Sequence, residues 1–286
     1  MYDKEFVSGA VKKFYAAFPF PGYMLAKYNL KDDLKKYATE YARMLYMNMP
    51  YGKTVLDIGC GTGQLSCLLS LKASRVVGVD FSEASIKKAD ELKQRLKLKN
   101  VEFLVRTIET LDLQEKFDYV FCNGVLHHLR DPYKGFTTVC ETLAEGSFCI
   151  IGFYNTFGRV AFKLTRFLSH KKKPAREITL AENAIMSQRP DSDNDKELMW
   201  NKDQYCHPYE TSFTVSEVLG WFSKNNIGYV SSMPSIEHFK SDRLFTRPFT
   251  RARTLVKPTI KNSLVEWSWT WNLRKSGGYA VIIGGR

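Results

Sequence analysis

Long apolar runs, paired cysteines and a surplus of acidic residues are all missing from this sequence. No stretch approaches the roughly 20 consecutive apolar residues of a membrane-spanning helix, which excludes such a helix. Residues 1–13 mix acids and lysines without an apolar stretch, so we expect no signal peptide. No two cysteines form a C-x-x-C pair, which argues against a zinc site. We therefore expect no metal, a cytoplasmic location and reduced cysteines, namely Cys60, Cys67, Cys122, Cys140, Cys149 and Cys206.

Acidic residues are outnumbered, and the imbalance is local. The 286 residues contain 42 Lys and Arg against 30 Asp and Glu, a net charge of +12. Phe157–Glu177 and His238–Lys261 each hold seven basic residues and one acidic residue, so the rest of the chain is neutral. Such segments indicate an anionic partner, either a membrane surface or RNA, and the alternative is a solvated basic surface.

Short apolar strands alternate with helical stretches through the middle of the chain. Hydrophobic residues make up 44% of the sequence, an ordinary value for a globular protein. Alternating strands and helices predict a parallel sheet with helices on both faces. We expect strands at 54–58, 75–80, 101–106, 117–123, 147–154, 229–232 and 278–283, and helices at 3–18, 30–49, 63–71, 82–96, 132–143 and 214–225.

The most informative stretch is V-L-D-I-G-C-G-T-G, which ends at Gly63. An apolar strand runs directly into G-x-G-x-G and then into a helix, so the glycines permit a tight turn and a close backbone approach to a ligand. The spacing differs from the G-x-G-x-x-G of dinucleotide sites, and the Gly-Lys-Ser/Thr of a P-loop is absent. Asp80 ends the next strand, where a carboxylate can accept both hydroxyl groups of a ribose. The alternative for Asp80 is a cap on the following helix.

Together, D-x-G-x-G-x-G from Asp57 and the later Asp80 resemble the class I S-adenosylmethionine-dependent methyltransferases. The stretch F-D-Y-V-F-C-N-G-V-L-H-H-L from Phe117 resembles their fourth strand, in the branch that includes the quinone and sterol C-methyltransferases. The resemblance implies a Rossmann-like α/β fold whose seven-stranded sheet ends in a reversed hairpin. It implies S-adenosylmethionine as methyl donor and S-adenosylhomocysteine as product.

This resemblance also divides the chain. We expect an N-terminal helical cap over 1–49, a cofactor-binding core over 50–155, and a core helix and strand over 214–235. The last core strand would lie at 277–286. The segments 156–213 and 236–276 would be two inserted lids, because long loops in compact domains usually serve binding.

Cofactor contacts follow from the resemblance, position by position. The glycine loop would line the methionine part, Asp80 would hold the ribose, and Asn123 would lie beside the methyl group. The family usually has an acidic residue where this chain has Thr107, so Ile108 would bind adenine through its backbone. Tyr15 would close the pocket from the N-terminal segment. The full set is Asp57, Gly59, Cys60, Gly61, Gly63, Asp80, Phe81, Thr107, Ile108, Asn123 and Tyr15.

Histidines are the candidate bases for an acceptor that loses a proton. His127 and His128 follow the fourth strand, at the sheet edge where open α/β folds bind ligands. His207 lies in the first insertion and is a further candidate, although each of these histidines also suits a structural role in a loop. Tyr154 is the fourth catalytic candidate, and Tyr154 with Arg159 would bind a polar or anionic acceptor.

Both insertions contain apolar residues at regular spacing. Over 158–170 the spacing predicts an amphipathic helix with Val160 and Leu164 on its apolar face and Arg159 on its basic face. The W-S-W-T-W motif at 267–271 has strand spacing, which would point its three tryptophans to one side. We expect methyl transfer to a small molecule that is amphipathic or anionic. The alternatives are an RNA methyltransferase and a protein that binds the cofactor without methyl transfer.

Overall fold

Seven strands form one mixed sheet in the computed structural model, which describes residues 9, 25–160, 162–164, 209–236, 248–249, 259–272 and 278–286. The strands are β1 (Thr54–Ile58), β2 (Arg75–Asp80), β3 (Val101–Val105), β4 (Phe117–Asn123), β5 (Leu143–Tyr154), β6 (Gly228–Met233) and β7 (Tyr279–Gly285). Their order is β3-β2-β1-β4-β5-β7-β6. β7 runs antiparallel to both neighbours, and the pairs from β3 across to β5 are parallel. The expected sheet with a reversed final hairpin is confirmed.

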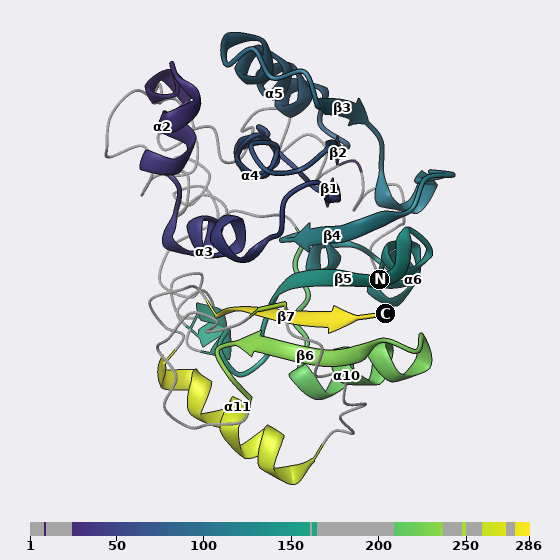
Figure 1. The fold of residues 1–286 in the computed structure, drawn as a ribbon. Coiled ribbons are helices and arrows are strands. Elements are labelled where there is room, and N and C mark those ends of the chain that lie inside the picture. The colour runs from purple at the N-terminus through teal and green to yellow at the C-terminus, as the bar shows by residue number, and fades with distance from the viewer. Residues whose placement is uncertain are drawn as a thin grey trace.

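Helices cover both faces of this sheet (Figure 1). The α-helices are α2 (Lys31–Lys36), α3 (Glu40–Asn48), α4 (Gln64–Leu69), α5 (Glu83–Arg95), α6 (Pro132–Glu141), α10 (Val215–Lys224) and α11 (Ile260–Asn272). Short 3₁₀ turns are η1 (Leu25–Lys27), η2 (Ile108–Thr110) and η3 (Leu126–His128). The helices α2 to α5 pack through one apolar cluster, and α6, α10 and α11 pack through a second cluster on the opposite face. Both faces of the parallel strands are buried, which explains why the sequences of these strands are nearly continuous apolar runs.

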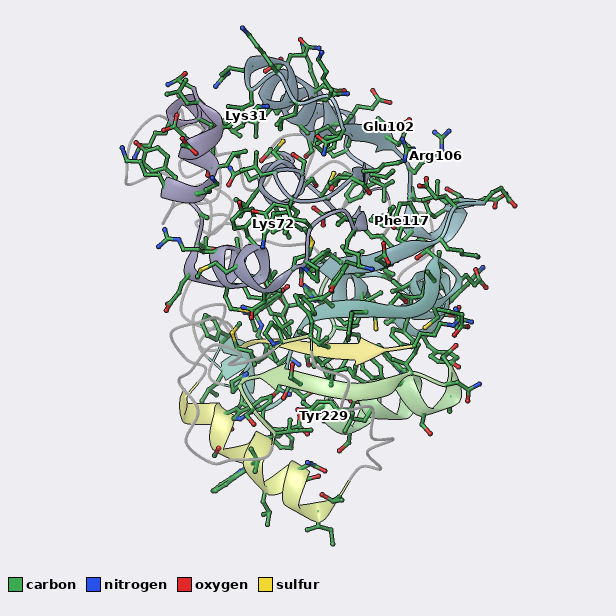
Figure 2. All side chains as sticks on the ribbon, viewed as in Figure 1. Lys31, Lys72, Glu102, Arg106, Phe117 and Tyr229 are labelled. Atoms are coloured by element: carbon green, nitrogen blue, oxygen red, sulfur yellow. The ribbon has the colours of Figure 1, made fainter. Side chains whose placement is uncertain are left out.

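Local sequence signals set several of these boundaries. A capping box begins α10 at Thr214, where the hydroxyl accepts from the Glu217 backbone N–H and the Glu217 carboxylate accepts from the Thr214 backbone N–H. Ser82 caps α5, where its hydroxyl accepts from the Ser85 backbone N–H. In Figure 2, the labelled Glu102 and Arg106 lie at the β3 edge of the sheet, and Phe117 is fully buried at the start of β4.

Some sequence-based expectations are wrong. Residues 30–49 form two helices rather than one, because the chain leaves the helical conformation at Tyr37 and restarts after Thr39, whose hydroxyl caps α3. Residues 267–271 lie in α11, not in a strand, so Trp267 is exposed while Trp269 is buried. The segment 236–276, which we expected to be an inserted lid, therefore contains a regular helix. Packing of Val265 and Trp269 on the core overrides the short-range alternation.

The basic helix expected over 158–170 is described only in part. Arg159, expected on the exposed basic face, is buried, whereas Val160 and Leu164 are exposed. That assignment of faces is therefore wrong in the described part. The expected helix at 3–18 and Cys206 lie outside the described residues, as do most of Phe157–Glu177 and His238–Lys261. Among the described residues, no helix is both long and apolar enough to cross a membrane.

Candidate functional site

The glycine loop connects β1 to α4 in left-handed backbone conformations. Gly59, Gly61 and Gly63 have φ angles of 74°, 53° and 77°. The backbone N–H groups of Gly59 and Cys60 both donate to the Val79 carbonyl, which fixes the loop on the end of β2. A Cβ on Gly63 would lie 2.7 Å from the Phe103 ring and 2.8 Å from Ala89. These glycines therefore serve the turn and the close packing beneath it.

Asp80 lies at the end of β2 and holds the loop from the side. Its carboxylate accepts from the Gly61 backbone N–H at 3.0 Å and from the Ser82 backbone N–H at 2.8 Å. Burial raises the pKa of Asp80, and these two hydrogen bonds oppose the rise. The two bonds leave further lone pairs on the carboxylate, which is what a ribose-binding acid requires. This geometry is compatible with both roles that the sequence suggests for Asp80, which are binding a ribose and capping the following helix.

Asp57 lies below the loop, inside the sheet. Its carboxylate accepts a 2.6 Å hydrogen bond from the Ser66 hydroxyl of α4, and the side chain is buried. Burial raises the pKa of Asp57 to about 6, and the negative charge of Asp80 adds to the rise. The hydrogen bond between Asp57 and Ser66 connects β1 to α4. Cys60 is also buried, and its Sγ donates to the Gly61 carbonyl.

Asn123 ends β4 and offers a buried amide group. Its Oδ1 accepts from the Tyr41 hydroxyl of α3 at 3.2 Å, whereas its Nδ2 is buried and has no hydrogen-bond partner among the described residues. A Cβ at Gly152 of β5 would lie 2.7 Å from Asn123 Oδ1 and would collide with the Tyr279 hydroxyl. Position 152 therefore needs a glycine, because the Asn123 and Tyr279 side chains leave no room for a Cβ atom there. A buried amide donor without a partner is a position at which an acceptor atom of a ligand can bind.

Tyr41 was not found from the sequence. It comes from a helix that carries no motif, and only the packing of α3 beside the sheet brings its hydroxyl to β4. Burial raises the pKa of Tyr41, so the hydroxyl stays protonated and continues to donate.

Aromatic rings gather beyond Asn123. His127 is buried, with its ring 4.1 Å from the Tyr154 ring and 4.2 Å from the His128 ring, measured between centroids. His128 Nδ1 lies 3.0 Å from the Tyr209 carbonyl. A carbonyl only accepts, so Nδ1 carries the proton, and a neutral ring then has its lone pair on Nε2. The structure thus brings His127, His128 and Tyr154 together.

Arg159 is bound differently from the expectation. Its guanidinium forms a two-pronged ion pair with Glu210, in which Nε and Oε1 are 2.8 Å apart and Nη2 also contacts Oε2. The same guanidinium stacks on the Tyr154 ring at 4.1 Å. Because Glu210 neutralises it, Arg159 holds Tyr154 in place rather than offering a free cation to an acceptor. Glu210 was not found from the sequence, since no local pattern links it to a residue 51 positions earlier.

The predicted adenine-side residues lie near the ends of β2 and β3. Phe81 directly follows Asp80 and is half-buried. Thr107 precedes η2, and its hydroxyl pairs with Thr110 at 2.9 Å, while Ile108 is buried. Tyr15 and His207 lie outside the described residues. Among the residues that the structure describes, no group of His, Cys, Asp and Glu side chains is arranged to hold a metal ion.

Comparisons with known proteins point to one family. A sequence model described as a methyltransferase domain matches residues 51–210. An uncharacterized protein of Synechococcus sp. is 25% identical over 266 residues, which cover 84% of this chain and 63% of that protein. A ubiquinone biosynthesis O-methyltransferase of Pseudomonas putida is 41% identical over 83 residues, 28% of this chain and 35% of that enzyme. This chain therefore covers less than two thirds of the length of either relative.

A solved structure shares the fold. It is the 1,6-didemethyltoxoflavin-N1-methyltransferase of Burkholderia thailandensis, with bound 1,6-didemethyltoxoflavin and S-adenosylhomocysteine. The TM-score is 0.55 at 14% sequence identity, and the match covers 100% of this chain and 91% of that one.

Proposed function

This chain belongs to the methyltransferase domain family and is a class I S-adenosylmethionine-dependent methyltransferase by sequence and fold, and we propose that it methylates a small amphipathic molecule. The observation that carries the proposal is the left-handed glycine loop held by Asp80, with the amide nitrogen of Asn123, unpaired among the described residues, at a neighbouring strand end. Ligands bind at this edge in open α/β sheets.

The residues present fit S-adenosylmethionine. In this proposal Gly59, Gly61 and Gly63 line the methionine part, Asp80 accepts from the ribose hydroxyls, and Asn123 Nδ2 donates to an acceptor atom of the ligand. Phe81, Thr107 and Ile108 contact the adenine. When bound, the cofactor supplies an electrophilic methyl group on a sulfonium sulfur. The chain contributes positioning and the exclusion of water, which supply much of the rate in such transfers.

The acceptor would lie against the aromatic group formed by His127, His128 and Tyr154. Their rings meet in tilted and edge-to-face arrangements, which favour a flat or apolar acceptor body, because aromatic side chains bury large areas and pack in these geometries. Where the acceptor loses a proton, His128 is the proposed base, since the Tyr209 carbonyl fixes the proton on Nδ1 and directs the lone pair to Nε2. The acceptor atom loses its proton to His128 as it gains the methyl group.

The first test is cofactor binding by calorimetry, for the wild type and for Asp80→Ala. We expect micromolar binding that the variant loses by about tenfold or more, since a charge-assisted contact and the loop anchor both disappear. Asp112→Ala, at an exposed loop position, serves as the control. Absence of binding at millimolar cofactor would overturn the proposal.

The second test identifies the acceptor class with a labelled methyl group. We expect label in small molecules of a lipid or metabolite extract and a strong loss of that transfer in His128→Ala. Label appearing only in RNA would instead establish the RNA methyltransferase alternative. Cofactor binding without transfer to any extract would favour a binding protein.

A further inference from the structure

Helix α11 exposes an apolar stripe on its outer side. Ile260, Leu264 and Trp267 are 84%, 54% and 61% exposed. Their spacing of four and three residues places them on one face of the helix. The opposite face carries Asn262, Val265, Glu266 and Trp269, all buried against the core. The helix therefore has a second apolar face that the described protein does not cover.

The stripe lies on the periphery of the molecule. In Figure 1, α11 runs along the outside beyond the edge strand β6. Its inner face is fixed, because the Glu266 carboxylate accepts from the Asn155 amide and from the Val215 backbone N–H, each at 2.6 Å. A helix anchored in this way presents its outer residues at a constant angle.

A second exposed apolar pair follows β5. Val160 and Leu164 are 45% and 56% exposed, and they are four residues apart in a helical turn. This turn begins a few residues after Asn155, the residue that Glu266 of α11 contacts. The two exposed apolar sets thus belong to segments joined by a direct hydrogen bond.

Charge selects the partner of these surfaces. Each apolar set lies within or directly beside one of the two basic segments, and these segments hold the whole net charge of +12. The only acidic residue of α11 is Glu266, which is buried, so the exposed side of the helix carries no negative charge. An anionic surface would meet no repulsion there.

We propose that Ile260, Leu264 and Trp267 of α11 dock this protein onto an anionic lipid bilayer. Partly inserted apolar side chains combined with basic residues are the two signals that give stable attachment at a membrane surface. RNA would stack on Trp267 but would gain nothing from the aliphatic Ile260 and Leu264. Three side chains also provide far less than the roughly 800 Å² per partner of a stable dimer. The inference goes beyond the proposed function and does not depend on methyl transfer.

Vesicle sedimentation tests this surface. The full chain is mixed with vesicles of equal parts phosphatidylglycerol and phosphatidylcholine, and with pure phosphatidylcholine. We expect binding to the anionic vesicles that weakens with salt, and a loss of about tenfold or more in Leu264→Ser/Trp267→Ser, since two large apolar side chains leave the interface. Met47→Ser, at a position 68% exposed on α3, is the matched control and should bind like the wild type.

The variants are checked for intact structure by cofactor binding and thermal unfolding, which the exposed substitutions should not change. Equal vesicle binding by the wild type and the double variant would overturn the proposal. The proposal would also be overturned if the wild type bound RNA but not vesicles. The same holds if the wild type formed a dimer that the double variant does not form.

Discussion

At the scale of single residues, Tyr41 and Asn123 act as one unit. The Tyr41 hydroxyl donates to Oδ1, which settles the orientation of the amide and turns Nδ2 toward the site. We predict that Tyr41→Phe weakens S-adenosylmethionine binding several-fold, on the order of 1 kcal/mol, because the amide loses its fixed orientation. Asn123→Ala should weaken it about tenfold or more. Calorimetric titration of the single and double variants measures both effects.

The double variant provides the decisive comparison for this pair. If Tyr41 acts through Asn123, adding Tyr41→Phe to Asn123→Ala costs no further affinity. Tyr46→Phe changes another tyrosine of the same helix, whose ring lies under Lys72, and should leave binding unchanged. Additive losses from the two substitutions would show that Tyr41 has no positioning role.

Asp57 should make the stability of the protein depend on pH. Burial raises its pKa in the folded protein to about 6, above the usual value of 3.8 for an aspartate. Between about pH 4 and pH 6 the folded state keeps a proton that the unfolded state releases, so the free energy of unfolding falls as pH rises. Asp57→Asn should therefore be more stable than the wild type at pH 7.5, by at most about 3 kcal/mol. The difference should vanish near pH 4.

Urea unfolding at several pH values measures this dependence in the absence of cofactor. Asp112→Asn, an exposed substitution, should follow the wild-type profile. Parallel profiles of the wild type and Asp57→Asn would mean that Asp57 is already ionised in the folded protein below pH 6.

At the scale of elements, α11 shows where sequence patterns fail. Alternation of Trp and small polar residues over a few positions suits a strand, but a helix forms when its buried residues meet the core. Glu266 is decisive in this packing, since its carboxylate accepts from the Asn155 side chain and from the first backbone N–H of α10. No local sequence pattern predicts the contact between Glu266 and Asn155, which are 111 residues apart. Capping boxes and strand-end glycines, by contrast, are local and were predictable.

We predict that Glu266→Ala lowers the free energy of unfolding by about 2–4 kcal/mol, because the buried Val215 backbone N–H loses its acceptor and the Asn155 amide keeps only its longer bond to the Phe213 carbonyl. Glu266→Gln should cost less, since an amide oxygen still accepts. Urea denaturation of both variants gives the comparison, with the exposed Ser263→Ala as control. Equal losses for Ala and Gln would show that the charge of the carboxylate, rather than an acceptor oxygen or the packing of the side chain, determines the effect.

At the scale of the whole molecule, the arrangement of the glycine loop, Asp80 and Asn123 was predictable from the sequence, and the packing around Tyr154 and α11 was not. The G-x-G-x-G loop, Asp80 and Asn123 lie where strands of one parallel layer end, so chain order alone indicates their proximity. Tyr41, Glu210 and the two faces of α11 depend on how helices and insertions return to the sheet. Those contacts follow from tertiary packing, which also turned Arg159 inward against the expectation from helical spacing.

The cofactor site should couple to the stability of the whole fold, because the loop joins β1, β2 and α4 in the centre of the sheet. A ligand that binds only the folded state at a hundredfold its Kd adds about 2.7 kcal/mol to the free energy of unfolding. For a chain of this size that corresponds to an increase in Tm of about 5–8 °C. We expect this increase with S-adenosylmethionine and S-adenosylhomocysteine in a calorimetric scan, and none with NAD, whose pyrophosphate needs a different glycine spacing. An equal increase with NAD would mean that the loop recognises only an adenosine group, and the assignment of Asn123 to the methionine end would then fail.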